Sequence, residues 1–128
     1  MARLFIFCLT FITLGCTYQD LPSTNILEGK WVEVNSKTDT IIFTTFGDYS
    51  YLSLNRGKEL RNGILLPKYL SGGYDYKISS DKISLRWWAS SNSAFNEYHF
   101  NVTPTGIIIG DFYNPGSRGA TLFFKKIR

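Results

Sequence analysis

The chain contains few of the residues on which catalytic and metal sites depend. Its 128 residues include a single histidine, His99, and two cysteines, Cys8 and Cys16. An enzyme site needs a nucleophile, an acid–base group or a metal held by several side chains, and zinc is held mainly by His and Cys. We therefore expect no catalytic residues, no bound metal and no cofactor, and we expect that the protein is not an enzyme.

His99 has one carboxylate near it, because Glu97 lies two residues earlier in a segment that alternates like a strand. A His–carboxylate pair is able to move a proton when both groups face a ligand. Tyr98 and Phe100 are expected to face the interior, and this turns His99 outward. We expect His99 to be exposed and without a chemical role.

The charges are modest in number and scattered along the chain. Lys and Arg number 14 against 10 Asp and Glu, a formal net charge of +4, and no basic run is longer than Lys125–Lys126. A nucleic-acid-binding domain shows a clustered basic stripe, so no nucleic-acid partner is expected. The positive charge is compatible with a mild attraction to anionic lipid or polysaccharide.

The longest apolar run, Leu4–Leu14, is too short to form a stable transmembrane helix. Its residues span about 16 Å as a helix, whereas the hydrocarbon core of a bilayer is about 30 Å thick. With Arg3 before the run and Gly15-Cys16 after it, the segment instead predicts a secretory signal peptide over residues 1–15. We expect the mature chain to begin at Cys16.

Residues 13–16 resemble the bacterial lipobox, in which a small residue precedes an acylated cysteine. Gly15 and Cys16 match this motif, and Thr13 departs from it because leucine is preferred there. The resemblance implies that Cys16 carries three acyl chains, which hold a protein firmly to a membrane. Thr17, in place of an aspartate, favours transport to the outer membrane of a bacterial cell envelope. The alternative is an ordinary secreted protein cut near Gly15.

Residues 16–28 are expected to form the lipid-bearing tether of one domain, residues 29–128. The stretch Tyr18–Leu27 is polar, contains Pro22, and reaches about 35 Å when fully extended. Loss of Cys8 with the signal peptide leaves one cysteine, so no intrachain disulfide is expected. The domain is long enough for one hydrophobic core but not for two.

From Lys30 onward, short runs of β-branched and aromatic residues are separated by Gly, Asn, Asp and Ser, which is typical of strands and turns. Eight such runs follow one another: 30–34, 40–45, 49–54, 74–78, 83–87, 98–102, 107–109 and 120–126. The succession of hairpins predicts an all-β fold, an eight-stranded antiparallel up-and-down barrel. A two-sheet β-sandwich has the same periodicity and stays the alternative.

Residues 56–73 interrupt this rhythm. The segment holds flexible or turn-forming glycines, among them Asn62-Gly63, around an apolar stretch that Pro67 breaks. Long connections in compact domains are often functional, so a flap over the barrel mouth is one interpretation. The other interpretation is a loop that packs Leu65 and Leu66 onto the domain.

The first predicted strand opens with Gly29-Lys30-Trp31. This Gly-x-Trp pattern is similar to the start of lipocalin-like (calycin) barrels, and the whole chain looks like the small lipocalin-like lipoproteins of Bacteroidetes. The resemblance implies that Trp31 has a structural role at the closed end of the barrel. It also implies that a basic side chain of the last strand, Lys126 or Arg128, stacks over Trp31. One barrel fold hosts many activities, so the resemblance implies a shape rather than a reaction.

Aromatic residues are the remaining functional signal, with 3 Trp, 8 Tyr and 10 Phe. Their alternation predicts that several rings share the barrel interior, where they bind a small apolar or amphipathic ligand. The residues of this predicted site are Tyr49, Tyr51, Tyr74, Tyr76, Trp87 and Phe100. Trp88 is adjacent to Trp87 and therefore faces the other side of the sheet. The alternative function is a protein-interaction module, an inhibitor or accessory subunit of the envelope, that uses Trp88 and the 56–73 segment.

Overall fold

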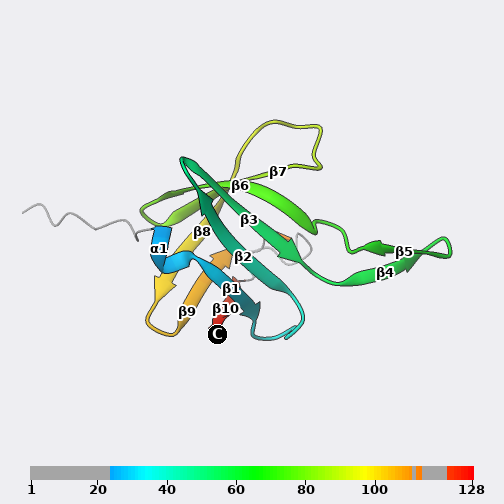
Figure 1. The fold of residues 1–128 in the computed structure, drawn as a ribbon, viewed down its shortest axis with the longest axis horizontal. Helices are drawn as coiled ribbons and strands as arrows, with labels where there is room; N and C mark the ends of the chain where they lie inside the picture. The colour runs from blue at the N-terminus through cyan, green and yellow to red at the C-terminus, as the bar shows by residue number, and fades with distance from the viewer. Residues whose placement is uncertain (1–23, 111, 114–120) are drawn as a thin grey trace, which may run out of the picture.

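The computed structural model describes residues 24–110, 112–113 and 121–128. Eight of its strands form a closed antiparallel barrel, in the order β1-β10-β9-β8-β7-β6-β3-β2 (Figure 1). These strands are β1 (Gly29–Glu33), β2 (Thr40–Phe46), β3 (Tyr49–Asn55), β6 (Gly72–Ser79), β7 (Lys82–Trp87), β8 (Asn96–Thr103), β9 (Gly106–Gly110) and β10 (Thr121–Ile127). The prediction of an all-β, eight-stranded antiparallel barrel is confirmed, and the sandwich alternative is wrong because the sheet closes on itself.

Closure depends on the pairing of the first and last strands of the barrel. In β1 and β10, Trp31 lies opposite Lys126 and Glu33 lies opposite Phe124. Each other barrel strand pairs with the strand that precedes or follows it, except that β3 pairs with β6 across an inserted hairpin. Because every one of these eight strands has two neighbours, none presents a free edge to other chains.

The barrel interior is filled by the side chains that alternate inward along each strand. Ile41 and Phe43 of β2 and Leu52 and Leu54 of β3 are all at most 2% exposed. Their neighbours in sequence point outward, which is the period of two that a strand imposes. Tyr76, which is 5% exposed, packs its ring edge-on against Phe43 with 5.3 Å between ring centroids. The predicted inward faces of β6 and β7 are confirmed by the burial of Tyr74, Tyr76, Ile83 and Leu85.

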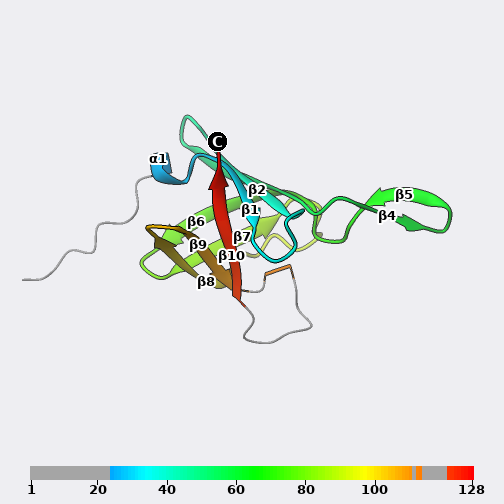
Figure 2. The same cartoon turned by 90° about the horizontal axis from the view of Figure 1, so that it is seen from below.

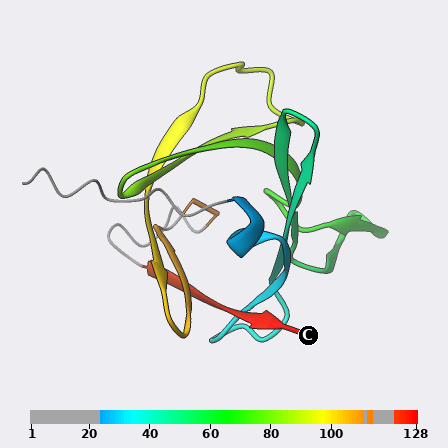
Figure 3. The same cartoon turned by 60° about the vertical axis from the view of Figure 1, so that its left-hand side comes forward.

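One end of the barrel is closed by a short helical turn, α1 (Thr24–Leu27), which lies within the ring of strands in Figure 3. Leu27 is fully buried, and its carbonyl accepts a hydrogen bond of 2.8 Å from the indole Nε1 of Trp31. Lys126 places its ammonium 5.4 Å from the centre of the Trp31 ring and donates to the carbonyl of Ile26 at 3.2 Å. Lys126, and not Arg128, is therefore the basic residue over Trp31.

Gly29 is required at the start of β1 by this same arrangement. Its φ angle is +115°, a conformation that residues with a side chain rarely adopt. A Cβ atom at this position would also lie 3.0 Å from Cε of Lys126. The Gly-x-Trp pattern thus has a physical reason here, since the glycine makes room for the lysine that covers Trp31.

The two ends of the barrel differ in the length of their connections. At the α1 end, β2 and β3, β6 and β7, and β8 and β9 are joined by two-residue turns at 47–48, 80–81 and 104–105. At the opposite end, which we call the mouth, the connections 34–39, 56–71 and 88–95 are longer. Binding residues concentrate in loops at one end of a rigid scaffold, so a binding site is expected at the mouth.

The 56–71 connection contains a second sheet, the hairpin β4 (Lys58–Arg61) and β5 (Ile64–Pro67), which projects from the mouth side of the barrel (Figures 1 and 2). Asn62 and Gly63 form its turn with φ angles of +51° and +78°, as a two-residue hairpin requires. The expectation that Leu65 and Leu66 pack onto the domain is wrong. They are 60% and 38% exposed because the hairpin points away from the barrel.

The signal peptide, the lipobox and Cys16 lie outside the described residues. Residues 24–27 of the predicted tether, 16–28, form α1, which accepts hydrogen bonds from Trp31 and Lys126 of the barrel. Within the described part of the chain, no helix is long and apolar enough to cross a membrane.

Candidate functional site at the barrel mouth

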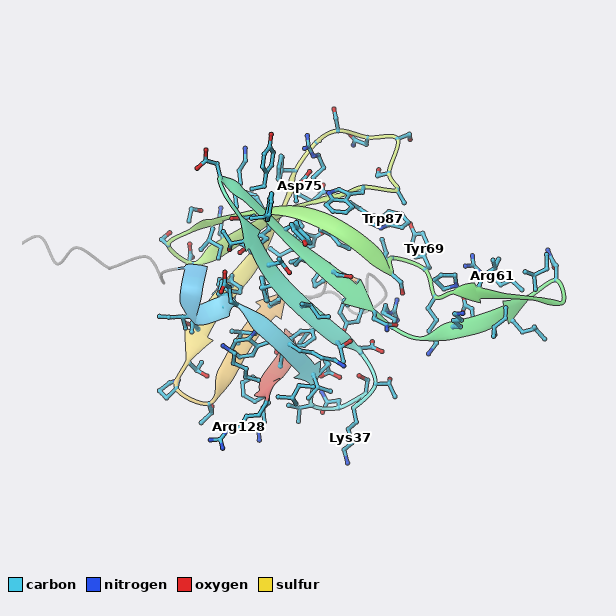
Figure 4. The ribbon with its side chains drawn as sticks, viewed as in Figure 1. Lys37, Arg61, Tyr69, Asp75, Trp87 and Arg128 are labelled. Carbon is cyan, nitrogen blue, oxygen red and sulfur yellow. The ribbon has the colours of Figure 1, made fainter. Side chains whose placement is uncertain are left out.

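A pocket of about 210 Å³ opens at the barrel mouth. Tyr69 and Trp87, which lie close together beside the base of the hairpin in Figure 4, form part of its wall. Tyr74 of β6, Tyr98 of β8 and Phe112 complete a set of five aromatic rings around the pocket. The rings come from separate strands and connections, so only the closed barrel brings them together.

The rings contact one another and form a continuous cluster. The rings of Trp87 and Tyr74 are stacked, with 6.4 Å between their centroids. Tyr69 packs edge-on against the same Trp87 ring, with 5.7 Å between centroids. Phe112 contacts Tyr74 at 5.7 Å and Tyr98 at 5.6 Å. Such offset and edge-to-face pairs are the favoured arrangements of aromatic side chains. The five rings therefore form one continuously packed part of the pocket lining.

Two polar groups of the ring cluster, a hydroxyl and an indole N–H, donate hydrogen bonds to the segment that leads from the hairpin into β6. The hydroxyl of Tyr74 donates to the carbonyl of Leu70 at 2.6 Å, and the indole Nε1 of Trp87 donates to the carbonyl of Ser71 at 3.3 Å. Burial raises the pKa of Tyr74, and the neighbouring Tyr98 and Tyr69 raise it further. The Tyr74 hydroxyl thus stays protonated and remains a hydrogen-bond donor.

The remaining lining of the pocket is mostly polar and uncharged. It is formed by Ser90, Asn92 and Asn96 together with Ala94. The side chain of Asn92 accepts from the amide of Ala94 at 2.9 Å, and the hydroxyl of Ser90 accepts from the amide of Asn92 at 3.1 Å. These bonds shape the 88–95 connection, and the pocket as a whole is amphipathic, because its lining combines aromatic rings with amides and hydroxyls.

A charged cluster lies at another part of the mouth, where Arg56 joins the hairpin to the barrel. Its guanidinium lies 3.5 Å from the carboxylate of Asp39 and 4.6 Å from the centre of the Tyr113 ring. It also donates to the carbonyls of Tyr69 at 2.9 Å and Tyr113 at 3.3 Å. Burial raises the pKa of Tyr113, with the negative charges of Asp39 and Glu33 adding to the effect. Arg56 therefore fixes the base of the hairpin to the mouth.

The six residues of the predicted ligand site do not share one cavity. Tyr74 and Trp87 line the mouth pocket, as the alternation suggested. Tyr76 and Phe100 lie deeper, buried at 5% and 2% exposure, and belong to the packed core. The inward orientation of these two residues is confirmed, and neither of them lines the mouth pocket.

Tyr49 and Tyr51 lie on the outside of the barrel. Tyr49 is 77% exposed, and Tyr51 contacts Trp88 on the outer face with centroids 5.7 Å apart. The expectation that these two rings face the interior is wrong, because Leu52 and Leu54 of the same strand point inward and strand alternation sends Tyr49 and Tyr51 outward.

Sequence reasoning missed several residues of the pocket. Tyr98 carried a usable signal, because it alternates with Phe100 on the inward face of its strand. Tyr69 and Phe112 lie in connections, where no period indicates which way a side chain points. In the sequence, Asn92 and Asn96 have no feature that distinguishes them from other residues of a connection. Only the fold shows that they lie beside the rings.

His99 is exposed, so the prediction that it faces outward is confirmed. Glu97, its neighbour on the same face, is 2.9 Å from the ammonium of Lys82. Among the residues that the structure describes, no group of three or more His, Cys, Asp or Glu side chains is placed to hold a metal ion.

No protein-family model, no curated protein and no solved structure matches this chain. The chemistry of the mouth pocket itself therefore carries the functional argument. That chemistry is a lining of aromatic rings, amides and hydroxyls around a small volume.

Proposed function

We propose that the protein is a lipid-anchored, non-enzymatic binding protein of a bacterial cell envelope, and that its barrel mouth takes a small amphipathic ligand. The observation that carries the proposal is the pocket at the mouth, where five aromatic rings face two asparagines and a serine. Ligand sites are typically concave and largely apolar, with a few placed polar groups that fix the orientation of the ligand. The mouth pocket combines five aromatic rings with such polar groups, and most of the surface that it exposes is polar.

The size of the pocket limits the ligand. Pockets for drug-sized molecules span about 300–1,000 Å³, and the mouth pocket measures about 210 Å³. The ligand is therefore smaller than a typical drug molecule. It binds at the rim and not in the barrel centre, which Phe43, Tyr76 and Phe100 occupy.

The cellular setting of this proposal comes from the sequence. The Gly15-Cys16 pair supports lipidation of Cys16, and Thr17 supports attachment to the outer membrane. The Trp31–Lys126 contact and the eight-stranded barrel support membership of the lipocalin-like group, of the kind found in small Bacteroidetes lipoproteins. The partners are then the membrane, through the anchor, and the small ligand at the mouth.

The proposal is tested with a substitution that fills the pocket with a larger side chain and leaves its five aromatic rings in place. Ala94 is exposed and lines the pocket, so Ala94→Trp places an indole in the ligand's space. Ala89, five residues earlier in the same connection, is exposed and outside the pocket wall, so Ala89→Trp is the matched control. Each full-length protein is purified from its native envelope, and mass spectrometry of the extracted small molecules measures what remains bound.

We expect one small molecule to accompany the wild-type protein and the Ala89→Trp variant in stoichiometric amount and to be lost from Ala94→Trp. Equal retention in both variants would place the ligand elsewhere. A wild-type protein that carries no small molecule, and gains none when incubated with an envelope lipid extract, would contradict the proposal.

A second candidate function is protein interaction through the β4–β5 hairpin. Four large aliphatic side chains on this hairpin are exposed: Leu60 by 70%, Ile64 by 61%, Leu65 by 60% and Leu66 by 38%. The pairing Leu60↔Leu65 places two of them on one face, and Leu66 and Ile64 lie on the other. Clustered exposed aliphatic residues are a feature of interaction surfaces.

This second candidate is tested by photo-cross-linking in living cells. A photoreactive amino acid replaces Leu65 in one strain and Thr105, in a turn at the α1 end, in another. A single cross-linked protein that appears only from position 65 would support the interaction module, and the same products from both positions would contradict it.

A further inference from the structure

A second depression lies on the outside of the barrel wall, over β6 and β7 and beside the 88–95 connection. It is a groove of about 390 Å³, lined by Asp75, Arg86, Trp87, Trp88 and the run Ser90–Ser93. Figure 4 shows Asp75 at the top of the barrel near this connection. The groove shares Trp87, Ser90 and Asn92 with the mouth pocket, but its floor is the outer face of the sheet.

The floor of the groove is an indole ring that is exposed and yet held in place. Trp88 is 57% exposed, and its Nε1 donates to Oδ1 of Asp75 at 2.9 Å. The ring lies directly over Gly73, where any Cβ atom would collide with it, and beside Tyr51. An aromatic ring that is already fixed loses little conformational entropy when a ligand stacks on it.

The charges in the groove neutralise each other. One carboxylate oxygen of Asp75, Oδ2, accepts from Arg86 twice, from Nε at 2.9 Å and from Nη2 at 2.6 Å, and the other, Oδ1, accepts from Trp88. The Arg86 guanidinium also lies 5.0 Å from the centre of the Phe95 ring. Desolvation acts to raise the pKa of Asp75, but the Trp88 hydrogen bond and Arg86 outweigh it and lower the pKa. The pair therefore stays ionised and offers polar groups without a net charge.

The remaining wall of the groove is a run of short polar side chains, Ser90, Ser91, Asn92 and Ser93. A matching ligand has one apolar face for the indole, many hydroxyl groups for the serines and asparagine, and no net charge. A sugar ring has these properties, because its C–H groups form an apolar face and its hydroxyls lie around the rim. The open shape of the groove suits a chain of sugars that passes across the wall.

We propose that this outer groove binds a neutral oligosaccharide, with one sugar ring stacked on Trp88 and its hydroxyls bonded by Arg86 and the 90–93 run. The site is distinct from the mouth pocket and goes beyond the function proposed there. Binding at the groove would attach the outer wall of the barrel to a glycan.

The test is titration of the full-length protein, in a detergent without a sugar headgroup, with five neutral hexasaccharides. The probes are maltohexaose, cellohexaose, laminarihexaose, mannohexaose and N-acetylchitohexaose, and binding is followed by calorimetry and by tryptophan fluorescence. We expect at least one of them to bind with a Kd of about 1 mM or tighter. Trp88→Ala should weaken this binding about tenfold or more, and Trp88→Phe, which keeps a ring, should restore part of it.

Two further variants keep the result interpretable. Phe46→Ala removes another exposed ring, 77% exposed on β2, and should leave the affinity unchanged. Ser93→Ala leaves the indole and its hydrogen bond intact and should weaken binding two- to fivefold. This variant tests the groove even if Trp88→Ala does not fold. Absence of binding by all five sugars at about 10 mM, or equal affinity in wild type, Trp88→Ala and Ser93→Ala, would overturn the proposal.

Discussion

At the scale of single residues, neighbouring side chains at the end of β7 take opposite roles, and Trp88 continues the pairing of that strand because its amide donates to the carbonyl of Gly73 at 3.0 Å. Trp87 lines the mouth pocket, whereas Trp88 lies on the outer face and forms the floor of the groove. This division was predicted, because adjacent residues of a strand point to opposite sides of the sheet. The direction in which Tyr49 and Tyr51 point was predicted wrongly, since two aromatic residues on one face do not show whether that face is the inner one.

Lys126 is the residue whose position the sequence left open. Lys126 and Arg128 were both candidates for the contact with Trp31, because both are basic and close to the end of the last strand. The register of β1 and β10, which pairs Trp31 with Lys126, decides between them. No short motif encodes that register, since it is set by the closure of the whole barrel.

We predict that Lys126→Met lowers the free energy of unfolding by about 1 kcal/mol, through loss of the contact with the Trp31 ring and of the bond to the Ile26 carbonyl. Urea unfolding followed by circular dichroism measures the change. The matched control is Lys125→Met, because Lys125 is an exposed neighbour that lies opposite Val32. Equal effects of the two substitutions would contradict a specific role for Lys126.

At the scale of elements, the eight barrel strands were predictable and the hairpin was not. The barrel strands each bury one face, so apolar residues recur at every second position, as in Ile83 and Leu85 of β7. The hairpin strands β4 and β5 bury neither face, and apolar and charged residues mix on both of them. Only the Asn62-Gly63 pair carried a local signal, and it marked the turn without identifying the strands.

The hairpin is built as a separate unit on the barrel. Arg61 donates to the carbonyl of Pro67 at 2.7 Å and lies 3.3 Å from Glu59, so the two strands are bound within the hairpin itself. An isolated two-stranded ribbon is only marginally stable in water. The tie from Arg56 to the mouth and the internal bonds of Arg61 are what hold it in a fixed position.

We predict that removal of the hairpin leaves the barrel stable. The amide of Lys68 donates to the carbonyl of Gly57 at 3.0 Å, so the two ends of the hairpin already meet. Replacing residues 58–67 with Gly-Gly should change the free energy of unfolding by less than about 0.5 kcal/mol, because none of the removed side chains is buried. A thermal or urea unfolding curve shifted by several times that amount would show that the hairpin is part of the core.

At the scale of the whole molecule, the two ends of the long axis have different structures. The helical turn α1, which follows the proposed anchor, and the β4–β5 hairpin lie at opposite ends in Figures 1 and 2. A chain attached to a membrane before α1 by a short tether can present the mouth and the hairpin away from that membrane. The proposed ligand site and the proposed interaction surface are then both on the side that faces the surrounding compartment.

The anchor itself is tested by Cys16→Ser. We predict that the wild-type protein fractionates with membranes and that the variant appears in the soluble fraction, because three acyl chains bury many methylene groups at about 0.8 kcal/mol each. Mass spectrometry of the intact protein should show the added mass of the acyl chains on the wild type. A wild-type protein of unmodified mass in the soluble fraction would contradict lipidation.

The sequence by itself determined the strands of the barrel, the turns between them and the inward face of most of them, because those features depend on local alternation and on turn residues such as Gly47 and Asp81. The tertiary structure decided which rings meet. Tyr69, Trp87 and Phe112 come from different parts of the chain, and contacts of that kind form only when the barrel closes. It also decided that the interior centre is filled and that the space for a ligand lies at the rim, because packing depends on the volumes of all inward side chains together.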